Sequence, residues 1–137
     1  MSFKNNKISK NDEEWRKILS DEAFKVTRKK ATEAPFSGEY NSNYATGMYL
    51  CACCNKKLFD SSTKFDSGSG WPSFYAPVSS DSIEEHQDNS YGMIRTEVTC
   101  SSCGAHLGHV FDDGPQPTFK RFCINSVALK FKEESCE

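Results

Sequence analysis

The sequence predicts a single domain whose body is mostly antiparallel β and whose N-terminal part is helical. The chain has 137 residues, close to the usual size of one domain, and its 36% hydrophobic and 12% aromatic residues supply a core. Short segments of β-type residues follow one another between turn-rich stretches, whereas helix-start signals occur near the N-terminus. These observations together favour a mostly β fold with a short helical start.

The helical part is expected within residues 11–30. Asn11 and Glu14 are spaced as a capping-box pair, and Ser20 or Asp21 can restart the helix, so one or two short helices are expected. We expect the domain core at about residues 13–131, with flexible tails at 1–10 and 132–137. Strands are expected at Met48–Cys51, Lys57–Asp60, Met93–Thr99, Leu107–Phe111 and Phe119–Phe131, and loops at DSGSGWPS, Ser79–Ser90 and DDGPQP.

Composition and charge disfavour several classes of protein. No apolar run approaches the roughly 20 residues of a membrane-spanning helix, and the mean hydropathy is -0.66. The net charge is -2, so we expect no nucleic-acid partner, because neutralising phosphates needs a concentrated basic surface. Residues 1–30 carry a net charge of +4, which is interpreted as a solvated helical face, with a binding tail as the alternative. The first residues lack the apolar core of a signal peptide, which predicts a cytoplasmic protein without membrane contact.

Seven cysteines are the unusual feature of the composition. An odd count without an export signal argues against a disulfide framework and favours metal binding or thiol chemistry. Cys51 and Cys54 lie in CACC, and Cys100 and Cys103 lie in CSSC. Because two intervening residues let a tight turn direct both thiolates at one ion, the two pairs predict one structural zinc site without an open coordination position.

Other interpretations of these cysteines remain open. They could be reduced buried thiols or a redox CxxC pair, although the presence of two matched pairs favours zinc. Cys53 could compete as a ligand, but simple spacing favours Cys51 and Cys54. The stretch CSSCGAHLGH could also form a compact zinc site of cysteine and histidine.

The last cysteine-bearing strand, KRFCINSVALKF, carries a second candidate site. Phe122 and Ile124 alternate with Arg121, Cys123 and Asn125, which predicts one apolar and one polar face. The apolar phase shifts after Asn125, which predicts a β-bulge or bend. Cys123 is either an inert buried cysteine or a nucleophile whose thiolate the Arg121 charge favours, with Asn125 orienting a substrate.

Candidate proton-transfer groups occur in HLGHVFDDGP. His106 and His109 would point to opposite faces of a regular strand, so both serve one pocket only if the backbone bends, which Gly108 permits. Asp113 could hold a histidine tautomer, although the two aspartates could equally form an ordinary turn. In GSGWPSF, Trp71 is either ordinary core or an aromatic wall for a methyl-bearing ligand.

Taken in order, the motifs GEY, the two CxxC pairs, SGSGWPSFY, HLGHVFDDGP and RFCINSVALKF resemble the methionine-(R)-sulfoxide reductase family, type B. The resemblance implies a zinc-bearing fold of two antiparallel sheets, a β-tent or Mss4-like arrangement, with short N-terminal helices. It also implies repair of oxidised methionine in proteins or peptides by reduction of the R epimer. Thioredoxin or another thiol would supply the electrons, and we expect a monomer.

The resemblance also implies roles for individual residues. Cys123 matches the nucleophile that attacks the sulfoxide sulfur and becomes a sulfenic acid. Trp71 matches the wall that receives the substrate methyl group, and Asn125 matches the amide beside the nucleophile. The positions that polarise and help protonate the sulfoxide oxygen are matched by His106, His109, Asp113 and Arg121.

The chain departs from the family pattern at Ser69. Many relatives carry a cysteine in this loop that resolves the sulfenic acid into a disulfide, which a serine cannot do. Cys136 in the C-terminal tail is the candidate resolving residue for Cys123, and Cys53 is a weaker candidate. Direct attack by an external thiol on the sulfenic acid is the alternative, and it is favoured at least as much.

Three rival functions remain at this point. A non-catalytic, zinc-stabilised β binding module would have no need of a thiol between Arg121 and Asn125. A zinc-ribbon nucleic-acid binder would carry its basic residues around the knuckles. A reductase of the S epimer, or of free methionine sulfoxide alone, would share much of the same chemistry.

Overall fold

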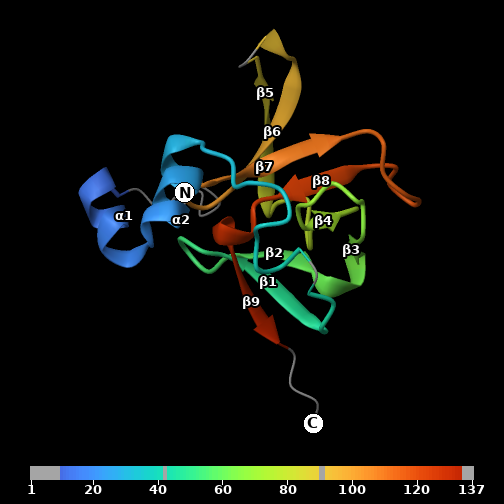
Figure 1. Cartoon of the computed structure of the whole chain (residues 1–137), viewed down its shortest axis with the longest axis horizontal. Helices are drawn as coiled ribbons and strands as arrows, with labels where there is room; N and C mark the ends of the chain where they lie inside the picture. Colours follow the sequence, from blue (N-terminus) through green and yellow to red (C-terminus); the bar gives the residue numbers. More distant parts are fainter. Residues whose placement is uncertain (1–9, 42, 90–91, 134–137) are drawn as a thin grey trace, which may run out of the picture.

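The computed structural model describes residues 10–41, 43–89 and 92–133, and two short helices open this part of the chain (Figure 1). Helix α1 (Asp12–Ile18) begins at the expected capping box, in which Asn11 and Glu14 exchange side-chain to main-chain hydrogen bonds. Ser20 caps helix α2 (Asp21–Lys29). Within the described ranges, neither these helices nor any other is long and apolar enough to cross a membrane.

The smaller of two antiparallel sheets has the strand order β2-β1-β9. It consists of β1 (Gly47–Cys51), β2 (Lys57–Asp60) and β9 (Leu129–Glu133). The expected strands at 48–51 and 57–60 are confirmed. Because β9 extends to Glu133, residues 132 and 133 belong to the sheet and not to a tail.

The larger sheet has six strands in the order β3-β4-β8-β7-β6-β5. The loop expected at 79–90 is wrong, because its central residues form β5 and pair with β6 from Ile83↔Cys100 to Asp88↔Arg95. Strand β5 lies at the edge of the sheet, and only Ile83 of its residues is buried. Its sequence therefore lacks the apolar alternation that predicts a strand. The strands are β3 (Lys64–Phe65), β4 (Ser73–Phe74), β5 (Ile83–Asp88), β6 (Arg95–Cys100), β7 (His106–Phe111) and β8 (Arg121–Ile124).

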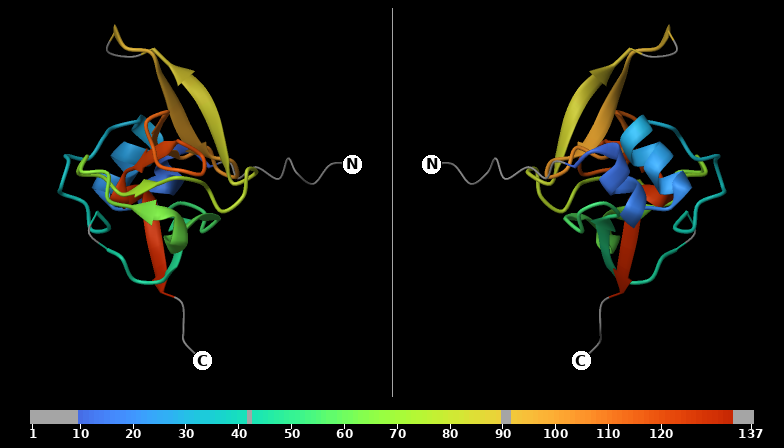
Figure 2. Two further views of the ribbon diagram at one scale, coloured as in Figure 1. Left: turned by 90° about the vertical axis from the view of Figure 1, so that its right-hand side faces the viewer. Right: turned by 90° about the vertical axis from the view of Figure 1, so that its left-hand side faces the viewer.

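The hairpin of β5 and β6 projects from the body of the molecule in all views (Figures 1 and 2). Strand β6 of this hairpin also pairs with β7, so the hairpin belongs to the same sheet as the strands that carry the site. The two sheets and helices confirm the expected fold class: mostly β, two antiparallel sheets and short N-terminal helices.

The single long strand expected at 119–131 is wrong. The segment forms β8 in the large sheet, then the 3-10 turn η3 (Ser126–Ala128), then β9 in the small sheet. The bend expected after Asn125 is therefore confirmed, as a crossing between sheets and not as a bulge. This crossing places Asn125 at the junction of the two sheets.

Aromatic side chains from both sheets pack together in the core. Phe59 of β2 stacks on Phe74 of β4 with ring centroids 4.5 Å apart, and Tyr49 of β1 meets Phe74 edge-on at 5.1 Å. Phe122 of β8 lies 5.9 Å from Phe59. Since these rings are nearly inaccessible to solvent, their burial fixes the small sheet against the middle of the large one.

Candidate functional site

The two CxxC pairs form two similar turns at strand ends. Cys51 is the last residue of β1, and Cys100 is the last residue of β6. In each turn the first cysteine donates its N–H to the carbonyl five residues later, at 2.8 and 2.9 Å. Each turn passes through a left-handed residue, Asn55 (φ 65°) and Gly104 (φ 77°). The same local geometry therefore presents both pairs of thiols.

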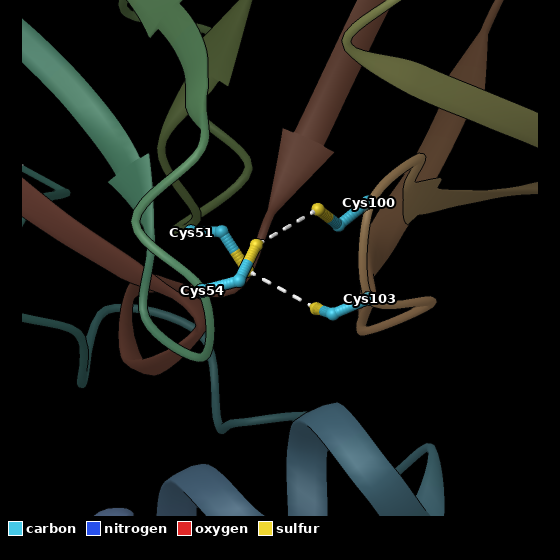
Figure 3. A group of neighbouring side chains, drawn as sticks. All are labelled: Cys51, Cys54, Cys100 and Cys103. Atoms are coloured by element: carbon cyan, nitrogen blue, oxygen red, sulfur yellow. Dashed lines mark hydrogen bonds between the residues drawn. The ribbon is translucent and has the colours of Figure 1, made fainter. Parts of the chain in front are cut away.

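The turns bring four sulfur atoms together, as Figure 3 shows. Cys51 Sγ lies 3.6 Å from Cys103 Sγ, Cys54 Sγ lies 3.6 Å from Cys100 Sγ, and all four atoms lie within 4.8 Å of one another. Sulfur atoms about 3.8 Å apart are expected around a tetrahedral zinc ion with bonds of about 2.3 Å. The donor set and its spacing fit such an ion.

The crowding of these thiols separates their pKa values. Hydrogen bonds with Cys100 and Cys103 raise the pKa of Cys51 far above its ordinary value. Hydrogen bonds from Cys100 and Cys51 lower the pKa of Cys103 to about 3. Arg28 of α2 also donates to the Cys103 carbonyl at 3.1 Å and to its sulfur at 3.5 Å. A divalent cation that displaced the remaining protons would let all four thiols ionise.

Cys53 lies beside this cluster but is not a member of it. The group with mutually close ligand atoms contains Cys51 and Cys54 from the first pair, as the spacing predicts. The side chain of Cys53 is 9% exposed, and hydrogen bonds from Cys103 and Cys51 lower its pKa to about 3. Histidine does not belong to the group, so the compact cysteine and histidine site is not formed among the described residues.

Cys123 occupies the middle of the large sheet and faces a second site. Its strand, β8, lies between β4 and β7, and Cys123 pairs with Ser73 on one side and His109 on the other. The thiol opens into a pocket of about 420 Å³. The pocket is lined by Thr32, Ser69, Trp71, Arg95, His109, Phe111, Arg121, Cys123 and Asn125.

The Cys123 thiol is surrounded by polar groups. Arg121 Nη1 lies 2.7 Å from its sulfur, and the hydroxyls of Ser69 and Ser73 lie at 3.6 and 3.7 Å. Asp113 accepts two hydrogen bonds from the same guanidinium, at 2.8 and 3.1 Å. The expectation that Asp113 holds a histidine is wrong, because its carboxylate instead fixes Arg121 beside the thiol. The guanidinium therefore lies against the sulfur and is held there by Asp113.

A bulge in β7 brings the two histidines together. Val98 pairs with Gly108 and Thr99 pairs with His106, which leaves Leu107 as an extra residue. The ring centroids of His106 and His109 consequently lie 5.5 Å apart. The backbone irregularity that both rings would need in order to face the same side is therefore present. His109 lines the pocket, whereas His106 is not among the lining residues.

Each histidine is held by a carboxylate that the sequence did not single out. His106 Nδ1 lies 2.8 Å from Glu97 Oε2, and His109 Nε2 lies 2.8 Å from Asp88 Oδ2. Burial lowers the pKa of His106, although Glu97 partly opposes this shift. Asp88 lies on a strand expected to be a loop, whereas Glu97 lies within an expected strand, two residues from the cross-strand position of His106. These acids meet the histidines because β5, β6 and β7 pair with one another, which no local sequence pattern indicates.

Trp71 and Asn125 lie on the pocket wall and share an unexpected partner, Glu33. Trp71 Nε1 donates to the Glu33 carbonyl at 3.0 Å, and Asn125 Oδ1 accepts from the Glu33 N–H at 3.0 Å. Asn125 Nδ2 also donates to the Leu107 carbonyl at 2.9 Å. Glu33 gives no local signal in the sequence beyond an acidic residue just before a turn-rich stretch, so the sequence alone does not identify it.

Fold and sites together define a β domain with a cluster of four cysteines spaced closely enough to hold a metal ion, and a separate thiol in a pocket. The SelR domain model matches residues 19–133, and the chain belongs to that family. The resemblance to the type B methionine sulfoxide reductases is thereby confirmed.

Curated relatives match along nearly their whole length. The chain is 61% identical over 126 residues to peptide methionine sulfoxide reductase MsrB of Pseudomonas putida (strain W619), which covers 92% of this chain and 95% of that protein. The MsrB of Methanosarcina mazei is 57% identical over 129 residues, 94% of this chain and 92% of the relative. The MsrB of Hahella chejuensis is 56% identical over 125 residues, 91% and 90% respectively.

Proposed function

We propose that this chain reduces methionine-(R)-sulfoxide in peptides and proteins to methionine. It is an oxidoreductase of the peptide methionine sulfoxide reductase type, in line with relatives of that name that match most of its length. The observation that carries the proposal is the Cys123 thiol, 2.7 Å from a guanidinium nitrogen in a pocket of about 420 Å³. That volume suits a small side chain such as oxidised methionine.

Cys123 is the proposed nucleophile. Its thiolate attacks the sulfoxide sulfur, and the sulfoxide oxygen is protonated because hydroxide is a poor leaving group. Overall, one oxygen passes from methionine sulfur to cysteine sulfur, so methionine gains the electron pair that Cys123 loses in becoming a sulfenic acid. The guanidinium of Arg121, which Asp113 holds in place, stabilises negative charge on the Cys123 sulfur and on the sulfoxide oxygen.

His109 is the proposed proton donor, since it lines the pocket and Asp88 holds its ring. General acid assistance of this kind contributes roughly 10²–10⁴-fold. His106, behind it and held by Glu97, supports the ring of His109 from 5.5 Å. Both histidines and Asp113 therefore keep a place in the mechanism, at different distances from the sulfur.

Trp71 and Asn125 are the proposed substrate contacts. The indole of Trp71 forms an apolar wall suited to the substrate methyl group, since sulfur-bearing groups pack well against aromatic rings. Asn125 lies two residues beyond Cys123 and lines the same pocket. With its oxygen and nitrogen both bonded, its amide has a fixed orientation.

Regeneration of the sulfenic acid needs thiols that supply two hydrogens and release water. Ser69, whose hydroxyl lies 3.6 Å from Cys123 Sγ, cannot form the disulfide. Cys136 stays the candidate resolving residue but lies outside the described residues, and Cys53 is packed against the four-cysteine cluster. Thioredoxin as reductant, a monomeric state and a cytoplasmic location stay predictions from the sequence.

Mass spectrometry after one turnover tests the resolving step. A disulfide between Cys123 and Cys136 would support internal resolution, whereas a persistent sulfenic acid with free Cys136 would remove Cys136 from the mechanism. Ser69→Cys is a positive control, because a thiol at this position would lie within reach of Cys123 and form the disulfide.

The four-cysteine cluster is proposed to hold one structural zinc ion. Its support is the set of four thiols, three of them buried, whose sulfur atoms lie within 4.8 Å of one another. An ion bound by four thiolates has no open position for a substrate, so it would stabilise the fold and take no part in the reaction.

The decisive experiment compares reduction of the separate R and S epimers of a methionine sulfoxide peptide by the wild-type protein and by Cys123→Ser. We expect reduction of the R epimer by the wild type and no activity of the variant. Equal activity of both proteins would refute the mechanism, and activity on the S epimer alone would refute the proposed specificity. A non-catalytic binding module would reduce neither.

A further inference from the structure

Glu33 is a buried acidic residue between α2 and the small sheet. Only 4% of its surface is exposed. Its carboxylate accepts hydrogen bonds from the Ser126 N–H at 2.9 Å and the Val127 N–H at 3.2 Å, at the start of η3. Burial raises the pKa of the Glu33 carboxyl, and the N–H groups of Ser126 and Val127 partly oppose that shift. The carboxylate thus joins residue 33 to the turn that follows β8.

The main chain of the same residue holds two walls of the pocket. The Glu33 N–H donates to Asn125 Oδ1, and the Glu33 carbonyl accepts from Trp71 Nε1, each at 3.0 Å. Trp71 precedes β4 and Asn125 follows β8, so the two side chains come from separate segments. Glu33 is a partner common to both.

The space around the carboxylate is also closely filled. A Cβ at Gly38 would overlap with Glu33 Oε2 and with Ser126 Oγ. A methyl group at position 38 would therefore push the carboxylate or the serine away from its present place. This close approach offers a second way to disturb Glu33 without changing a residue that lines the pocket.

We propose that Glu33 is a positioning residue, whose carboxylate anchors its main chain to η3 so that this main chain fixes the Asn125 amide and the Trp71 indole. The proposal rests on the proposed reductase function. Loss of the carboxylate leaves two N–H groups of Ser126 and Val127 without their acceptor, and buried donors left unpaired disfavour the close packing of the two segments. The main chain at 33 then shifts, and with it both pocket walls.

The kinetic test compares Glu33→Ala and Glu33→Gln with the wild type on a methionine-(R)-sulfoxide peptide. We expect kcat of Glu33→Ala to fall roughly 10- to 100-fold, because small displacements of positioning groups have effects of this size. Glu33→Gln keeps one acceptor oxygen and should retain more activity. Tyr49→Phe is the matched control, because it removes a core hydroxyl bonded to Asn43, away from the residues that line the pocket.

A spectroscopic readout separates positioning from general loss of stability. The sequence has two tryptophans, so two indole N–H resonances report on Trp71 and Trp15. Trp71 donates to Glu33, whereas the indole N–H of Trp15 has no hydrogen-bond partner in the part of the chain that the structure describes. We expect the Trp71 resonance to move in the Glu33 variants while the Trp15 resonance stays in place.

The outcomes separate the two proposals. Glu33→Ala with wild-type kcat, a loss equal to that of Tyr49→Phe, or an unmoved Trp71 resonance would overturn the role of Glu33. If Glu33→Ala does not fold, Gly38→Ala takes its place and should lower kcat and move the same resonance. Absence of reductase activity in the wild type would instead refute the proposed function, and the indole resonances would still report on the anchoring.

Discussion

Two buried cysteines of the large sheet, Cys100 and Cys123, have the same side chain and opposite surroundings. Cys100 is inaccessible to solvent and faces other thiols, with Cys54 Sγ at 3.6 Å. Cys123 is 9% exposed and faces Arg121 at 2.7 Å together with the Ser69 hydroxyl. A thiol among thiols is suited to share an ion, whereas a thiol among donors beside a pocket is suited to attack a substrate.

The difference lies in the strands that each cysteine adjoins. Cys100 ends β6, where the chain turns and meets the matching turn after β1. Cys123 lies within β8, where both neighbouring strands supply polar side chains to its polar face. For these two cysteines, the position in the sheet indicates the chemical role better than the residue type does.

A short segment joins the two regions. Arg28 donates to the carbonyl and sulfur of Cys103, Lys30 lies 3.2 Å from Glu97, which holds His106, and Glu33 holds Asn125. The end of α2 and the residues after it thus contact both the four-cysteine cluster and the residues that support the pocket, within six positions of the chain. Substitution of a cysteine in the cluster is expected to disturb the pocket by destabilising the fold. Substitution of a pocket residue is expected to leave the cluster intact.

The largest expected effect is the loss of stability on substitution of Cys100, which substitution of Cys123 should not cause. Cys100→Ser removes one of four proposed zinc ligands, so we expect loss of bound metal and about 3–5 kcal/mol less free energy of unfolding. Cys123→Ser should keep its metal and its melting temperature while losing activity. Metal analysis and thermal unfolding of both variants check the contrast, which fails if Cys100→Ser keeps a full zinc content and an unchanged Tm.

A smaller effect concerns the charge beside the catalytic thiol. Arg121→Met removes the guanidinium that donates to the Cys123 sulfur at 2.7 Å, so we expect kcat/KM to fall roughly 10- to 100-fold, as for lost hydrogen bonds to charged groups. Lys120→Met is the matched control, since Lys120 is adjacent in sequence but pairs with the exposed Asp112. Equal losses in the two variants would contradict a specific role for Arg121.

The smallest effect is a pH dependence of stability from His106. Burial lowers the pKa of His106, so the folded protein binds fewer protons than the unfolded chain just below the ordinary histidine pKa of about 6.5. This contribution to stability is present above that value and is lost as the pH falls through it toward the lowered pKa. On going from pH 7.5 to 5.5, His106→Gln should therefore lose less stability than the wild type, by on the order of 1 kcal/mol.

Thermal unfolding at the two pH values checks this prediction. His86→Gln is the control, because the His86 side chain is 49% exposed and should not reproduce the difference. The four-cysteine cluster is unchanged in all three proteins, so its own response to acid cancels in the comparison. An identical pH dependence of wild type and His106→Gln would show that His106 does not contribute.

Several features could be predicted because their signals are local. The capping box of Asn11 and the two CxxC turns depend on residues only a few positions apart, and both were predicted correctly. The polar edge strand β5 was missed because its side chains lack alternation, and its strand character depends on pairing with β6. The long C-terminal strand was predicted as one because its change of sheet at η3 depends on packing between the sheets.

The sequence by itself determined the mostly β fold class, the pairing of the four cysteines and the placement of Cys123 between Arg121 and Asn125. These follow from spacing and from the two-residue period of a strand, which act over a few neighbouring positions. The tertiary structure alone decided that Asp113 binds Arg121, that Asp88 and Glu97 hold the histidines, and that Glu33 holds Trp71 and Asn125. Such partners meet through strand register and the buried crossing between sheets, where unpaired polar groups are costly and most of them are therefore bonded to groups from distant parts of the chain.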